Sequence, residues 1–122
     1  MIEQIDPAEF KSWLAARTTP VVVLDVREAW ELQLASIQAQ AIGLEFELIT
    51  IPMNSIPSEM AALSESAKDK TIACLCHHGM RSQRVAQYLA QNGLGEIAAQ
   101  IVNIAGGIAA WSHSVDPSVP QY

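Results

Sequence analysis

The chain has 122 residues, half of them apolar and 16% charged, and its formal net charge at pH 7 is −6. This composition is typical of a compact globular domain and excludes a disordered chain, which would carry more charge and fewer apolar side chains. The chain has thirteen acidic and only seven basic residues. Nucleic acids and anionic membranes bind proteins through clustered Lys and Arg, so this excess of acidic residues argues against both kinds of partner.

The first half of the chain alternates predicted strands with predicted helices. A short edge strand at 1–5 leads into a helix that Asp6 caps, with Pro7 at its first position. Residues 21–26 are a continuous apolar, β-branched run, which predicts a strand buried on both faces. A short helix is expected at 28–35, while 36–43 has no clear pattern.

The second half continues this alternation. A strand is predicted at 48–51, a helix from Pro57 to Leu63 and a polar connection at 64–70. Further strands are predicted at 71–75 and 101–104, on either side of the most regular helix, at 82–91, which Gly93 ends. Gly106-Gly107 turns the chain into a last short helix that carries Trp111.

Strands and helices that alternate in this way predict an α/β fold, with a largely parallel central sheet and helices on both of its faces. We expect one domain over residues 1–122, with an extended tail from about residue 115. No apolar stretch approaches the roughly 18 residues of a membrane span, and no signal peptide is visible, so a cytoplasmic location is expected.

The candidate site lies between the predicted strand at 71–75 and the helix at 82–91. Its sequence is Cys76-His77-His78-Gly79-Met80-Arg81-Ser82. Backbone N–H groups in a loop that enters a helix converge on one point and stabilise an anion there. A thiol at the head of this loop is therefore expected to ionise readily and to act as a nucleophile.

Three segments together resemble the single-domain rhodanese family. They are the cysteine loop, Leu24-Asp25-Val26-Arg27-Glu28 with Trp30-Glu31, and Asn103-Ile104-Ala105-Gly106-Gly107-Ile108 with Trp111. The resemblance implies a sulfurtransferase that takes a sulfane sulfur from a donor such as thiosulfate. Cys76 would hold this sulfur as a persulfide and pass it to a thiol or to cyanide.

The same resemblance implies roles for the other loop residues. Backbone N–H groups from His77 to Ser82, through Gly79 and Met80, would cradle the persulfide, and Arg81 would attract anionic donors at the rim. The implied partners are small sulfur-containing anions and thiols, and a sulfur-acceptor protein in the cell. The implied reaction needs no metal and no organic cofactor.

Other functions use a similar segment. A persulfide carrier or sensor would need the same residues, and some rhodanese-like domains are non-enzymatic interaction modules, although these usually lack the cysteine. Cysteine phosphatases and arsenate reductases are less favoured because phosphatases place five residues between Cys and Arg, where this chain has four.

Several neighbouring residues are given structural interpretations. Asp25 and Arg27 are expected to pair and to support the cysteine loop. Cys74 is expected to be a small buried hydrophobe and a free thiol, with a resolving role as the minor alternative. His77 and His78 lack the paired spacing of a zinc site and are expected to shape the entrance. Trp30 and Trp111 are both assigned to the core.

Overall fold

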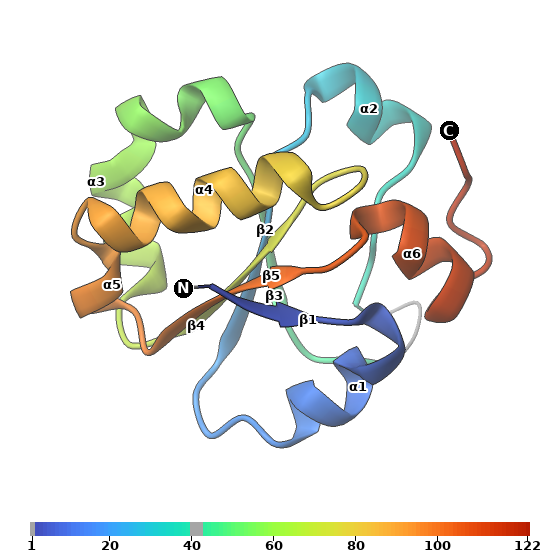
Figure 1. The fold of residues 1–122 in the computed structure, drawn as a ribbon, viewed down its shortest axis with the longest axis horizontal. Coiled ribbons are helices and arrows are strands. Elements are labelled where there is room, and N and C mark those ends of the chain that lie inside the picture. The colour runs from blue at the N-terminus through green and yellow to red at the C-terminus, as the bar shows by residue number, and fades with distance from the viewer. Residues whose placement is uncertain (1, 40–42) are drawn as a thin grey trace.

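The computed structural model describes residues 2–39 and 43–122 (Figure 1). Within these residues, every strand belongs to one five-stranded sheet with parallel neighbours. The strands, in their order across the sheet, are β1 (Glu3–Ile5), β5 (Gln100–Ile104), β4 (Thr71–Leu75), β2 (Val21–Asp25) and β3 (Glu47–Thr50). The predicted edge strand at 1–5 is thus confirmed for Glu3–Ile5, and Met1 lies outside the described residues.

Helices cover both faces of this sheet, which confirms the predicted fold class (Figure 1). One face packs against α3 (Ile56–Ala67), α4 (Met80–Gln91) and the short α5 (Leu94–Ile97). The other packs against α1 (Pro7–Ala15) and α6 (Gly107–Ser114). The short α2 (Ala29–Leu34) follows β2, and a 3₁₀ turn, η2 (Met53–Ser55), leads into α3.

The central strands β2 and β4 bring the candidate site residues to one edge of the sheet. All five residues of each strand are buried, as the apolar runs predict. In their parallel register Asp25 lies beside Leu75, so Arg27 and Cys76 leave the sheet at the same edge. This edge is where open α/β sheets place their ligands.

Two predicted boundaries are wrong. The connection assigned to 64–70 is helical as far as Ala67, because Leu63 and Ala67 lie four residues apart and are both buried against the sheet. α4 begins at Met80, two residues before the predicted start, because Gly79 ends the loop with a left-handed φ of 98°. The sequence interpretation also missed α5.

The assignment of Trp30 to the core is wrong. Its side chain is 61% exposed, and Leu34, four residues later, is 50% exposed. The buried side chain of α2 is Glu31, so the apolar pair faces away from the sheet. Trp111 is 0% exposed and packs against Phe10 at 4.9 Å between ring centroids, which confirms its assignment.

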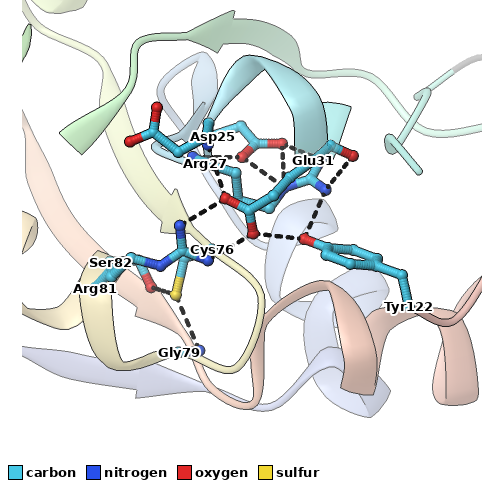
Figure 2. Close-up of polar contacts among 9 residues, drawn as sticks. Asp25, Arg27, Glu31, Cys76, Gly79, Arg81, Ser82 and Tyr122 are labelled. Carbon is cyan, nitrogen blue, oxygen red and sulfur yellow. Dashed lines mark hydrogen bonds and ion pairs between the residues drawn. The ribbon is translucent and has the colours of Figure 1, made fainter. Parts of the chain in front are cut away.

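The residues that follow α6 fold back onto the domain. Val119 is buried, and its carbonyl oxygen accepts a hydrogen bond from Ser112 Oγ. The predicted tail is therefore packed, and it carries Tyr122 to the carboxyl edge of the sheet (Figures 1 and 2). In the described part of the chain no helix is both long enough and apolar enough to cross a membrane.

Candidate active site

Cys76 is a buried thiol with two hydrogen-bond donors on its sulfur. It follows the last residue of β4 and is 1% exposed. Its Sγ accepts a hydrogen bond from the backbone N–H of Gly79 at 3.0 Å and another from Ser82 Oγ at 3.3 Å (Figure 2). The N-terminus of α4 lies at the same place, and its positive dipole end favours an anion bound there.

The loop that begins at Cys76 is anchored to the start of α6. The carbonyl oxygen of Cys76 accepts a hydrogen bond from Ile108 N at 2.8 Å, and that of His77 accepts one from Ala109 N at 3.1 Å. Gly107 permits this approach, because a Cβ on it would contact Cys76 O and lie 2.5 Å from His77 O. The Gly-Gly turn therefore holds the first two residues of the loop in place.

Arg81 forms an ion pair with Glu31. Its two terminal nitrogens each lie 2.7 Å from one carboxylate oxygen, and Glu31 is 2% exposed (Figure 2). The guanidinium lowers the pKa of Glu31 to about 2, and the same hydrogen bonds raise the pKa of Arg81. The positive charge that was expected to attract anionic donors at the rim is therefore paired with a carboxylate.

Asp25, Arg27 and Tyr122 complete this polar network. Arg27 and Asp25 form a fully buried ion pair at 2.7 Å, as expected. Arg27 also donates a hydrogen bond to the hydroxyl of Tyr122 at 3.1 Å, and that hydroxyl donates to Glu31 Oε1 at 2.9 Å (Figure 2). The network connects β2 to the first turn of α4 through side chains from four separate segments.

The two histidines of the loop are stacked with Tyr122. The ring of His77 lies 3.9 Å from that of Tyr122 and 3.8 Å from that of His78, measured between centroids. Burial and the neighbouring His78 lower the pKa of His77, so its neutral form is favoured at neutral pH. Met80 is 70% exposed, beside the loop.

Cys74 is a free, fully buried thiol. Burial raises its pKa to about 12, which makes it a poor nucleophile at neutral pH and argues against a resolving role. Among the residues that the structure describes, no group of three or more His, Cys, Asp or Glu side chains could hold a metal ion.

A comparison with protein families matches residues 6–114 to the rhodanese-like domain. The chain belongs to the rhodanese-like family. The match covers β2, the cysteine loop and all of α6, so it includes all three segments that carried the resemblance. The rhodanese-like fold places Cys76 at the carboxyl edge of the sheet, where the family resemblance predicts the reactive sulfur.

Relatives of this rhodanese-like chain include proteins described as sulfurtransferases. It is 32% identical over 116 residues to the putative sulfurtransferase YtwF of Bacillus subtilis, with 95% of this chain and 96% of that protein covered. It is 34% identical to an adenylyltransferase and sulfurtransferase, MOCS3-2, of Zea mays, with 93% of this chain covered. The chain spans only 22% of that maize protein, and the same share of a second maize relative, MOCS3-1.

A solved structure agrees with these sequence relatives. A rhodanese-related protein from Thermoplasma volcanium has a TM-score of 0.71 and 30% sequence identity, with 98% of this chain and 99% of that chain covered. This likeness supports the family and the fold together.

The structure brings most of the predicted site residues together and adds two, Glu31 and Tyr122. Ser82, which was expected to contribute its backbone N–H, contacts Cys76 through its hydroxyl. Glu28 and Glu31 are three residues apart, the spacing of a capping box at a helix start. The sequence therefore contained a pattern that singles out Glu31. No sequence pattern points to Tyr122, which reaches the site through the folded tail.

Proposed function

We propose that this chain is a sulfurtransferase in which Cys76 carries a sulfane sulfur as a persulfide. The observation that carries the proposal is the pair of donors on Sγ, the N–H of Gly79 and the hydroxyl of Ser82. The terminal sulfur of a persulfide is an anion, and donors fixed in advance beside it stabilise that charge without reorganisation. The family membership and the described sulfurtransferase relatives support the same chemistry.

The proposed reaction has two steps. The thiolate of Cys76, which has lost its proton to solvent, attacks the outer sulfur of a donor such as thiosulfate. The sulfur–sulfur bond of the donor breaks, its electron pair leaves with sulfite, and Cys76 keeps the transferred sulfur as a persulfide anion. A thiolate or cyanide then attacks that outer sulfur, and the electron pair of the broken bond restores the Cys76 thiolate.

A persulfide carrier that serves a specific protein is the second candidate. The maize relatives favour it, because the region similar to this chain is about a fifth of a longer protein described as both an adenylyltransferase and a sulfurtransferase. A carrier would load sulfur stoichiometrically but turn over slowly with small acceptors. An enzyme that acts on small molecules would load sulfur and would also turn over rapidly with small acceptors.

The phosphatase alternative fits the site less well. The loop has four residues between Cys76 and Arg81, and both terminal nitrogens of Arg81 bind Glu31. A phosphatase needs an arginine that holds the phosphoryl oxygens bidentately. We therefore expect no hydrolysis of an aryl phosphate.

Intact-mass measurement of the reduced protein after incubation with thiosulfate tests the proposal. We expect a gain of one sulfur atom, which cyanide removes as thiocyanate. Cys76→Ser should show no gain, whereas Cys74→Ser, the matched control, should load sulfur as the wild type does. Loading that persists in Cys76→Ser would show that another residue holds the sulfur and would overturn the assignment.

A further inference from the structure

The pairing of Arg81 has a consequence for the choice of sulfur donor. Arg81 is the arginine nearest to Cys76 in the chain and stands in the first turn of α4. Both of its terminal nitrogens are engaged by Glu31 at 2.7 Å. Arg84, one turn further along α4, lines an apolar hollow against Met53 and Pro57.

Glu31 is itself held firmly in this pairing. Its Oε2 also accepts a hydrogen bond from the backbone N–H of Glu28 at 2.8 Å. Its Oε1 accepts one from the hydroxyl of Tyr122 at 2.9 Å (Figure 2). Each carboxylate oxygen therefore has two donors. A buried carboxylate with four donors stays ionised and has no freedom to turn away from Arg81.

An ion pair of this kind contributes little net charge to the cysteine loop. Among the described residues, the hydrogen-bond donors on Cys76 Sγ are neutral, the Gly79 N–H and the Ser82 hydroxyl, and the N-terminus of α4 lies beside them. These suit the single negative charge of a persulfide. They offer no full positive charge for the second negative charge of a dianionic donor.

We propose that Glu31 is a specificity-determining residue, which neutralises Arg81 and so favours sulfane donors with one negative charge over dianions such as thiosulfate. This inference rests on the proposed function. The chemistry is the same for both donor types. The Cys76 thiolate takes the outer sulfur, and the electron pair of the broken bond leaves with a sulfinate for a monoanionic thiosulfonate or with sulfite for thiosulfate.

Steady-state kinetics with two donors tests the inference. Methanethiosulfonate, a monoanion, and thiosulfate, a dianion, are compared in the wild type and in Glu31→Gln, with cyanide as the acceptor. Gln keeps the size of the side chain and one acceptor but has no charge, so Arg81 is freed to attract the donor. We expect KM for thiosulfate to fall about tenfold, KM for methanethiosulfonate to change less than about threefold, and kcat to stay similar.

Two further variants test whether the pairing of Glu31 with Arg81 causes the change in donor preference. Glu28→Gln removes one negative charge from the same helix start without releasing Arg81, and should leave the preference between donors unchanged. Tyr122→Phe removes one hydrogen bond to Glu31 and should shift the preference in the same direction as Glu31→Gln, by about twofold. It also supplies a test if Glu31→Gln fails to fold.

The outcomes separate this inference from the proposed function. If both donors load sulfur onto Cys76 but Glu31→Gln and Tyr122→Phe keep the wild-type preference, the specificity role is wrong and the sulfurtransferase proposal stands. An equal shift in Glu28→Gln would assign the effect to general charge and would also overturn the role of Glu31. If neither donor loads sulfur onto the wild type, both proposals fail.

Discussion

At the scale of single residues, Glu31 shows how one buried carboxylate serves both folding and chemistry. Its carboxylate accepts a hydrogen bond from the backbone N–H of Glu28 at the start of α2 and forms an ion pair with Arg81 at the start of α4. Removing one partner from a buried ion pair is costly, because the other charge loses its compensation. The 32% exposure of the Arg81 side chain moderates that cost, since water can solvate the freed guanidinium.

The lowered pKa of Glu31 predicts a pH dependence of stability. Its pKa falls from 4.5 to about 2, chiefly because Arg81 donates hydrogen bonds to it. A carboxyl with a depressed folded-state pKa contributes stability above its unfolded pKa and loses that contribution as pH falls toward the folded value. We expect Glu31→Gln to lower the free energy of unfolding by at most about 3 kcal/mol near neutral pH.

Urea denaturation of both proteins at a series of pH values measures this contribution. The difference in unfolding free energy should be constant from about pH 8 to about pH 6 and should shrink as pH falls below about 4.5. A difference that stayed constant down to about pH 3 would show that the charge of Glu31 contributes nothing to stability.

At the scale of elements, the turn between β5 and α6 supports the loop between β4 and α4. Gly107 has a φ of 61°, and a Cβ added to it would clash with the carbonyl oxygens of Cys76 and His77. Any Cβ at this position would push the two loops apart. The distance between the loops decides whether the backbone N–H groups of Ile108 and Ala109 can donate hydrogen bonds to Cys76 and His77.

Gly107→Ala is therefore expected to reduce sulfur transfer at least tenfold and to destabilise the fold, because it combines backbone strain with a clash. Gly93→Ala is the matched control. Gly93 also has a positive φ, of 103°, but among the described residues nothing lies within 4 Å of the position that a Cβ would take there. The control should lose stability and keep its turnover in a cyanide assay; equal losses of turnover in both variants would contradict the role of the close approach.

At the scale of the whole molecule, the sheet separates two hydrophobic clusters. One contains Cys76 and the buried faces of α3 and α4. The other contains Phe10 and Trp111, whose rings meet in an edge arrangement at an interplanar angle of 65°. Both clusters are needed to bury a parallel sheet on its two faces.

Trp111 and Trp30 provide a matched pair for testing this arrangement. Trp111→Ala should lower the free energy of unfolding by about 3–5 kcal/mol, because it leaves a large cavity in the second cluster. Trp30→Ala should lower it by less than about 1 kcal/mol, because that side chain is mostly exposed. Circular dichroism during urea denaturation measures both values. A comparable loss in the two variants would contradict the placement of Trp111 in the core and of Trp30 at the surface.

The sequence was sufficient for the order of the five strands along the chain and for the place of Cys76 directly after β4. The apolar runs of β2 and β4 are contiguous, and such runs predict buried strands without knowledge of their neighbours. Cys76 follows one of these runs directly and precedes a glycine and a helix start. Local chemistry of this kind can be read from neighbouring residues in the chain.

The partners of the charged side chains required the folded chain. Glu31, Arg81 and Tyr122 come from α2, α4 and the final segment, and the sequence interpretation named no partner for Arg81. An ion pair forms where two side chains come within a few ångströms in a buried setting, and separation along the chain carries no information about that distance. Trp30 was misassigned for the same reason, because helical spacing marks a shared face but not whether that face is turned toward the sheet.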